Sequence, residues 1–229
     1  MLLAEDLLLL MTDDDTGELA ASGTEVDVAL GGALLIELTL RERVDVAGPD
    51  ERVRAGRLVV RDAGPTGDPV LDEALAVVGQ KEGKKPQSVV ARLGKGTRAR
   101  LYARLTDSGV LRAEEGRVLG IFPSHRWPLH DAAHETSVRA ELGTALRNGR
   151  TTDPRAGALI SLLHALGTVD KALDPAAVGL SEREMRVNAR RIAEGDWAAT
   201  AVRQAVDSMN AATVAAISSA AVIGGAGGS

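Results

Sequence analysis

The stretch VALGGALLIELTL, at residues 28–40, constrains the fold most strongly, because nearly every residue in it is apolar. It forms the centre of a helix that we predict over residues 25–42. A helix that is apolar on all sides is stable in water only when other elements cover all of it. The sequence therefore predicts a buried central helix with further helices packed around it.

The composition of the chain agrees with such a helical core. Apolar residues make up 45% of the 229 residues but aromatic residues only 2%, so aliphatic side chains must fill the interior. Aliphatic side chains suit close-packed helices, whereas an all-β sandwich would need more aromatic residues. The net charge of −5 argues against nucleic acid as the partner of the whole surface, so any site for a polyanion must be local. The chain has no cysteine, which excludes disulfides and thiolate sites.

The first predicted element is an amphipathic helix that the turn at residues 13–17 ends. Its apolar face consists of Leu3, Leu7, Leu8 and Leu10. Glu5 and Asp6 interrupt this apolar stretch, so we interpret it neither as a signal peptide nor as a membrane span. Residues 211–223 are too short to cross a bilayer, and we therefore expect a cytoplasmic protein.

Residues 64–75, GPTGDPVLDEAL, have the chemistry of a helix start. Asp68 is a good N-cap, Pro69 occupies the first helical position, and Asp72 and Glu73 lie in the positively polarised first turn. These acids would repel a phosphate, so the segment is predicted to start a helix that stops at Gly79. Two short paired strands are expected before it, at residues 43–48 and 56–62, and a polar linker after it, at residues 81–86.

The remaining pattern predicts mostly helices. Helices are expected at the segments 86–93, 97–109, 131–148, 154–166, 181–194 and 196–218, with a β-hairpin at about 112–125. Residues 224–229, GGAGGS, are predicted to be a flexible tail. The simplest fold is a single mainly α domain over residues 1–223, a helical bundle with short β-hairpins.

The segment ARLGKGTRARLYAR, residues 91–104, is the most informative for function. It holds five cations and no acid, in a chain that is acidic overall: Arg92, Lys95, Arg98, Arg100 and Arg104. Gly94 and Gly96 precede a predicted helix whose first amide groups lack partners, which favours an anion site at Lys95, Arg98 and Arg100. A solvated basic helix face explains the same residues equally well.

Other readings of the sequence have less support. The residues 94–99 match G-x-G-x-x-A, but a hairpin follows where a dinucleotide-binding fold needs a strand that ends in an acid. A helix that leads into a hairpin also resembles a winged helix, which keeps DNA binding open. His130 and His134 lie one helical turn apart, but Asp131 is one methylene short for a metalloprotease base, so we expect a solvated helix start and no metal. No catalytic motif is present, and we predict no cofactor and no enzymatic activity.

Several segments, taken in order, resemble the Golgi phosphoprotein 3 family, and the resemblance spans nearly the whole chain. They are LLAEDLLLL near the start, LGGALLIELTLRERV at 30–44, GPTGDPVLDEAL at 64–75, TRARLYARLTDSGVL at 97–111, WPL at 127–129 and ALISLLHALGTVDKAL at 158–173. The family includes peripheral membrane adaptors that bind phosphatidylinositol 4-phosphate. Its fold is a mainly α bundle with a protruding β-hairpin.

The resemblance also implies roles for particular residues. The hairpin would mediate contacts within a homotetramer or touch the membrane, through Val118, Leu119, Ile121 and Phe122. The family binds its lipid headgroup with one Trp and three Arg. Arg98 falls on one of these arginines and Lys95 replaces another, whereas the Trp position falls near Ser22 and the third Arg near Gly31. Because Lys binds phosphate only as a point charge, a weaker and less selective site is implied.

The sequence thus predicts a cytoplasmic adaptor, peripheral at the inner face of the membrane, that binds an anionic phosphorylated lipid headgroup. The first alternative is an assembly protein that has kept the fold and lost the lipid. The second is a winged-helix DNA-binding protein.

Overall fold

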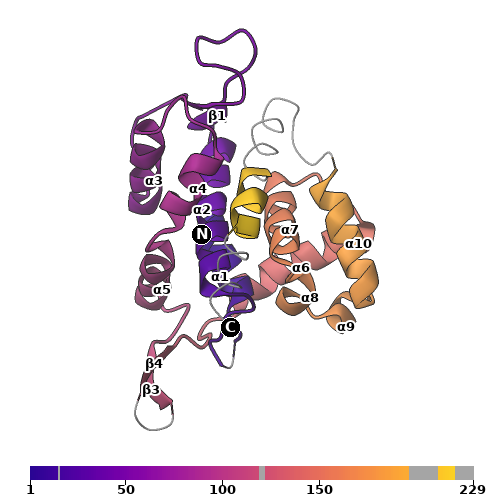
Figure 1. The fold of residues 1–229 in the computed structure, drawn as a ribbon. Helices are drawn as coiled ribbons and strands as arrows, with labels where there is room; N and C mark the ends of the chain where they lie inside the picture. Colours follow the sequence, from indigo (N-terminus) through magenta and orange to yellow (C-terminus); the bar gives the residue numbers. More distant parts are fainter. Residues whose placement is uncertain (15, 119–121, 196–210, 220–229) are drawn as a thin grey trace, which may run out of the picture.

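A computed structural model gives the fold and describes residues 1–14, 16–118, 122–195 and 211–219. Helix α2 (Gly23–Leu40) runs through its centre, as Figure 1 shows, and every residue from 28 to 39 is buried. The helices in contact with α2 are α1 (Leu3–Met11), α3 (Pro69–Gly79), α4 (Gln87–Gly94), α5 (Thr97–Asp107) and α7 (Pro154–Leu166). The prediction of a mainly α bundle around one buried helix is confirmed.

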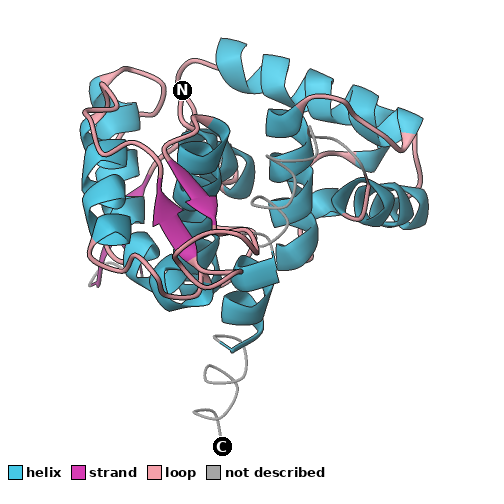
Figure 2. Ribbon diagram, turned by 90° about the horizontal axis from the view of Figure 1, so that it is seen from above, coloured by secondary structure: helices cyan, strands magenta, loops and turns pink. Residues whose placement is uncertain are grey.

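The other helices lie on two sides of α2 and α1. In Figure 1, α3, α4 and α5 occupy one side, and the hairpin of β3 (Glu114–Val118) and β4 (Phe122–Arg126) protrudes beyond α5. The opposite side holds α7 together with four further helices and the helical residues 211–219. The four are α6 (Ala133–Asn148), α8 (Val169–Ala172), α9 (Pro175–Val178) and α10 (Glu182–Ala193). Figure 2 shows the same arrangement from above, with helices in most of the volume.

Helix α1 differs from its prediction. It is not amphipathic, because all nine of its residues are buried, Glu5 and Asp6 included. A buried carboxylate is costly unless it is paired, and both acids find arginines: Arg104 Nε lies 2.9 Å from Glu5 Oε1, and Arg155 Nη2 lies 2.6 Å from Asp6 Oδ2. These ion pairs allow a helix with two acids to lie entirely inside the core.

The short strands confirm the predicted pairing. Strands β1 (Val44–Val46) and β2 (Leu58–Val60) are antiparallel, with Val44 opposite Val60. The segment 81–86 is more than a polar linker, because its backbone bonds to β2. The amide of Leu58 donates to the carbonyl of Lys84 at 2.9 Å, and the amide of Gly83 donates to the carbonyl of Leu58 at 2.9 Å.

The start of α3 is as its sequence predicts. Asp68 Oδ1 accepts hydrogen bonds from the amides of Val70 at 2.9 Å and Leu71 at 3.4 Å, and Pro69 is the first helical residue. The carboxylate of Asp72 turns back and accepts from the amide of Thr66 at 2.6 Å. The capping chemistry of residues 64–75 therefore serves the architecture.

In the C-terminal part the long helices α6, α7 and α10 confirm their predictions. The short helices α8 and α9 are additional to them. Of the helix predicted over 196–218, residues 196–210 lie outside the described part, as does the predicted tail at 224–229. Among the helices of the described residues, none is both long enough and apolar enough to span a bilayer.

Candidate functional site

The segment 91–104 meets the first turn of α2 because two glycines let α2 and α4 approach at backbone distance. A Cβ at Gly94 would collide with the carbonyl oxygen of Asp27, and a Cβ at Gly31 would collide with the carbonyl oxygen of Val90. Gly96 then takes a left-handed conformation, with φ of 74°, and starts α5 without a side-chain cap. We call the place where the first turns of α2 and α5 meet the α2–α5 junction.

Arg98 lies within this junction. Its guanidinium rests against Gly23, where an added Cβ would be 2.6 Å from Nη1. Its Nε is 3.1 Å from Oδ1 of Asp27, and both side chains are about one-third exposed, at 32% and 33%. Within the described residues, Oδ1 of Asp27 is buried and has no hydrogen bond of acceptable geometry. Burial raises the pKa of Asp27, and the charge of Arg98 offsets this only in part. The pair is therefore a single, loose contact.

The other cations of the segment diverge from Arg98. Arg100 forms an ion pair with Glu73 of α3 and donates from Nη2 to the hydroxyl of Thr97 at 3.0 Å. Arg104 bridges two helix starts, with Glu5 Oε1 at 2.9 Å from Nε and Asp68 Oδ2 at 2.7 Å from Nη1. These two arginines tie α5 to α1 and α3. Of the predicted group of Lys95, Arg98 and Arg100, the last is therefore engaged by Glu73 and Thr97, and the anion-binding role of the group stays a prediction.

Lys95 connects α4 to α5 and is exposed to solvent. Its ammonium group has no hydrogen bond or ion pair with any described residue. Lys95 stands three residues before Arg98 in the chain, and its free ammonium group adds positive charge at the start of α5.

A cavity of about 550 Å³ begins at Arg98 and follows the outer face of α5. Its walls are mainly apolar and come from α5, the turn at Gly17 and the base of the hairpin. The rings of Tyr102 and Trp127 stack in it, with centroids 4.1 Å apart and planes 5° apart. Arg98 thus faces the junction on one side and an apolar cavity on the other.

Comparison with known proteins identifies the family of the chain. The sequence model of the family described as Golgi phosphoprotein 3 (GPP34) matches residues 3–209 of the chain. The chain belongs to the Golgi phosphoprotein 3 family. The predicted resemblance is confirmed by this match, which covers α1 to α10.

A relative within this family is Vacuolar protein sorting-associated protein 74 of Eremothecium gossypii. It is 31% identical over an alignment of 165 residues, and the match covers 63% of this chain and 48% of the relative. The chain therefore spans about half the length of the curated relative that it matches. The name of this relative links that protein to vacuolar protein sorting.

Two positions that depart from the family pocket have structural roles in this Golgi phosphoprotein 3 family member. Ser22, at the expected Trp position, is the N-cap of α2 and forms a capping box with Glu25, whose carboxylate accepts from the Ser22 hydroxyl at 2.6 Å. Gly31, at the expected Arg position, packs against the backbone of α4 and leaves no room for a side chain. Of the pocket residues that the resemblance implies, Arg98 and the substituted Lys95 remain, and their role in binding stays a prediction.

The family hairpin is present, with the register Glu114 opposite Arg126 and Val118 opposite Phe122. Leu119 and Ile121 lie outside the described residues. The prediction that this hairpin contacts other copies of the chain or a membrane stays a prediction.

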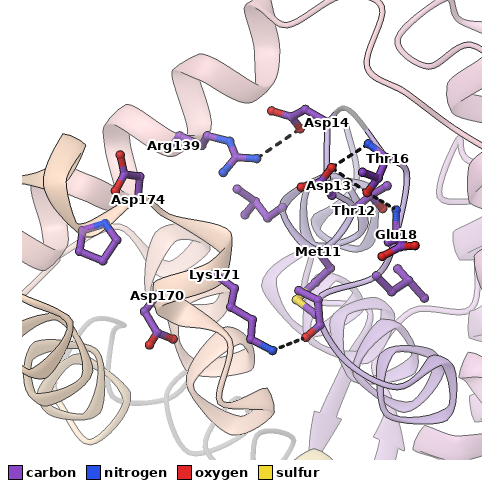
Figure 3. Close-up of a pocket in the computed structure, with 14 residues that line it drawn as sticks. Met11, Thr12, Asp13, Asp14, Thr16, Glu18, Arg139, Asp170, Lys171 and Asp174 are labelled. Carbon is purple, nitrogen blue, oxygen red and sulfur yellow. Dashed lines mark hydrogen bonds and ion pairs between the residues drawn. The ribbon is translucent and has the colours of Figure 1, made fainter.

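Figure 3 shows a second cavity, of about 560 Å³, between the turn after α1 and the helices α6, α8 and α9. Its charged lining residues are Asp13, Asp14, Glu18, Asp170, Asp174, Arg139 and Lys171. The two cations are engaged, since Arg139 Nη2 lies 3.5 Å from Asp14 Oδ1 and Lys171 Nζ donates to the carbonyl of Ala20 at 3.0 Å. This cavity is acidic and would repel a phosphate, so of the two cavities only the one at Arg98 suits an anion.

The two histidines at the start of α6 point to different partners. His134 Nε2 is 2.7 Å from Oδ1 of the buried Asp6. The sequence predicts a solvated helix start here, but this histidine contacts α1. His130 Nδ1 is 3.3 Å from Nη2 of Arg112. The described residues contain no group of three or more acids and histidines that would hold a metal ion.

Proposed function

We propose that this chain is a peripheral membrane adaptor that binds an anionic phosphorylated lipid headgroup at Lys95 and Arg98. The observation that carries the proposal is the loosely paired guanidinium of Arg98 at the α2–α5 junction, with the exposed Lys95 in the link that precedes α5. Helix starts favour negative charge, and an arginine fork binds phosphate oxygens in pairs. The proposal assigns the chain a binding role and no reaction.

The identity of the lipid is proposed from the family resemblance. Phosphatidylinositol 4-phosphate is the headgroup that the family resemblance implies, and we propose that the chain binds it at the inner face of the membrane. Since Ser22 and Gly31 stand where the family has its other pocket residues, we expect weaker and less selective binding. Asp27 lowers the affinity further, because a phosphate must compete with it for Arg98.

Vesicle flotation tests the proposal. Wild type and Arg98→Ala are compared on vesicles that contain phosphatidylinositol 4-phosphate, phosphatidylserine or only phosphatidylcholine, at low and moderate salt. We expect Arg98→Ala to lose roughly tenfold in affinity for phosphoinositide vesicles, as for one charge-assisted contact of about 1.4 kcal/mol. Arg183→Ala is the matched control, because Arg183 is exposed on α10, on the opposite side of α2 from α5. Equal recovery of wild type and Arg98→Ala rejects the proposal.

An assembly role without lipid is the second candidate, and the structural roles of Ser22 and Gly31 favour it. It predicts no vesicle binding at any composition, together with an oligomer in sedimentation analysis that depends on the hairpin. DNA binding has less support, because Arg98, Arg100 and Arg104 each contact a carboxylate and α5 does not present a free cationic face. A gel shift that weakens steeply with salt would favour it instead.

A further inference from the structure

The apolar cavity beside Arg98 exists because its floor is built from small residues. Ala99 and Ala103 lie one turn apart on the outer face of α5, and Gly17 and Ala113 line the sides. Longer side chains at any of these four positions would fill the space. The amphipathic α5 thus presents alanines to solvent where a surface helix normally carries long polar side chains.

One wall of the cavity is held in place before any ligand arrives. Tyr102 and Trp127 stack almost in parallel, and the hydroxyl of Tyr102 lies 2.9 Å from the hydroxyl of Thr12. This hydrogen bond satisfies the polar end of the tyrosine within the protein, so its ring presents an apolar surface to the cavity. A pre-formed apolar wall favours a hydrocarbon ligand, because binding orders no further side chains.

The charges of the cavity give it a direction. Arg98 lies at one end and the exposed Asp107 at the other, and the rise of α5 separates the two residues by roughly 13 Å along the helix. Arg98 also borders the α2–α5 junction, and the exposed Lys95 precedes α5 at the same end of the helix. A ligand with an anionic head and an apolar tail therefore fits with its head at Lys95 and Arg98 and its tail along the alanines, directed toward Asp107.

We propose that this cavity holds one hydrocarbon chain of the anionic lipid whose headgroup Lys95 and Arg98 bind. The inference rests on the proposed function, because Arg98 is shared by headgroup and cavity. It adds a second source of affinity, since each methylene group removed from water contributes favourably. The cavity thereby compensates for the family pocket residues that Ser22 and Gly31 do not supply.

Fluorescence quenching of Trp127 reports directly on the cavity. The measurement uses the full chain with Trp197→Phe, which leaves Trp127 as the single tryptophan. The probe is a monoalkyl phosphate with a brominated chain, below its micelle concentration. We expect saturable quenching by this probe, no quenching by its unbrominated form or by inorganic phosphate, and at least tenfold weaker binding after Ala103→Leu, which fills the cavity at an exposed position.

The controls separate this inference from the proposed function. Arg183→Ala leaves quenching unchanged, and a brominated alkyl trimethylammonium probe, with the opposite head charge, binds at least tenfold more weakly. If Ala103→Leu binds the phosphate probe as wild type does, or if both head charges quench equally, the cavity inference is overturned. It is also overturned if quenching depends on protein concentration, which would indicate a second copy of the chain in the cavity. Flotation that still depends on Arg98 would then leave the headgroup proposal intact.

Discussion

Two arginines that meet carboxylates show how differently this fold uses the same chemistry. Arg155 donates from Nη2 to Asp6 Oδ2 at 2.6 Å and to the carbonyl of Met1 at 2.8 Å, and from Nη1 to Glu37 Oε2 at 3.1 Å. The carboxylates it meets are buried, with 1% and 5% of their side chains exposed. We call this group the Arg155 node.

Arg98, in contrast, meets Asp27 through one contact of 3.1 Å, and both side chains remain about one-third exposed. The Arg155 node joins two buried acids, and each acid has one further side-chain partner, since His134 Nε2 lies 2.7 Å from Asp6 Oδ1 and Arg41 Nε lies 2.8 Å from Glu37 Oε1. Because both acids are buried, Arg155 cannot exchange partners without loss of stability. The Arg98 pair contributes little to stability and leaves its carboxylate poorly satisfied. The comparison teaches that an arginine able to exchange its carboxylate for a ligand is recognised by a single contact and by partial exposure of both partners. The number of arginines in a segment does not identify it.

The largest effect is expected from breaking the Arg155 node. Arg155→Met keeps the apolar stem but leaves the buried Asp6 with only His134, and the buried Glu37 with only Arg41, as a side-chain partner. We expect the free energy of unfolding to fall by about 3 kcal/mol, the lower end of the loss for a buried ion pair that loses one partner, because both acids keep a second partner. Urea unfolding followed by circular dichroism measures it. Arg98→Gln is the matched control and should change the free energy of unfolding by less than about 1 kcal/mol; similar losses in the two variants would contradict the comparison.

The local elements of this fold can be predicted from the sequence. The all-round apolar run at 28–40 predicts the buried α2, and Asp68 with Pro69 predicts the start of α3, because both signals act over a few residues. The strand pairs and the two helices around Gly96 follow in the same way. Family membership was also predictable, since it rests on the order of several such segments.

Ion pairs between residues that are distant in the sequence cannot be predicted in this way. Asp6 and Arg155 are 149 residues apart, and no local pattern pairs them. The signal that could have found the node is the presence of Glu5 and Asp6 within an apolar run, because a charge on a buried helix requires a partner somewhere. The basic segment 91–104 shows the opposite error: it looks uniform in sequence, but Glu73 and Glu5 engage Arg100 and Arg104 after folding.

The second effect concerns what holds the α2–α5 junction together. If the Arg98 pair is weak, the close contact of α2 with α4 must position the site. Gly94→Ala places a Cβ against the carbonyl of Asp27, and we expect it to lower the free energy of unfolding by about 1 to 3 kcal/mol through overpacking. Gly79→Ala at the end of α3 meets open space and is the control. Thermal unfolding of both variants measures the difference in stability. If Gly94→Ala is as stable as wild type, the ion pair of Arg98 and Asp27, and not the close helix contact, holds the junction together.

The smallest effect, and the sharpest for function, is expected from Asp27→Asn. Because burial raises the pKa of Asp27 in the folded protein, the fold holds this proton more tightly than the unfolded chain does. The contribution of the carboxyl to stability is therefore complete at pH values below its unfolded pKa of about 4 and is lost as the pH rises through the folded pKa. Relative to wild type, Asp27→Asn should thus gain stability as the pH rises from about 4 to 7.

The same substitution removes the competitor for Arg98. At neutral pH we expect Asp27→Asn to bind phosphoinositide vesicles roughly two- to fivefold more tightly, which is the value of one half-exposed ion pair of up to about 1 kcal/mol. The gain should shrink with added salt, because the interaction is screened. Weaker vesicle binding by Asp27→Asn would mean that Asp27 orients Arg98 for the ligand. The Arg98 pair would then be a fixed part of the site, like the Arg155 node, and not an exchangeable pair.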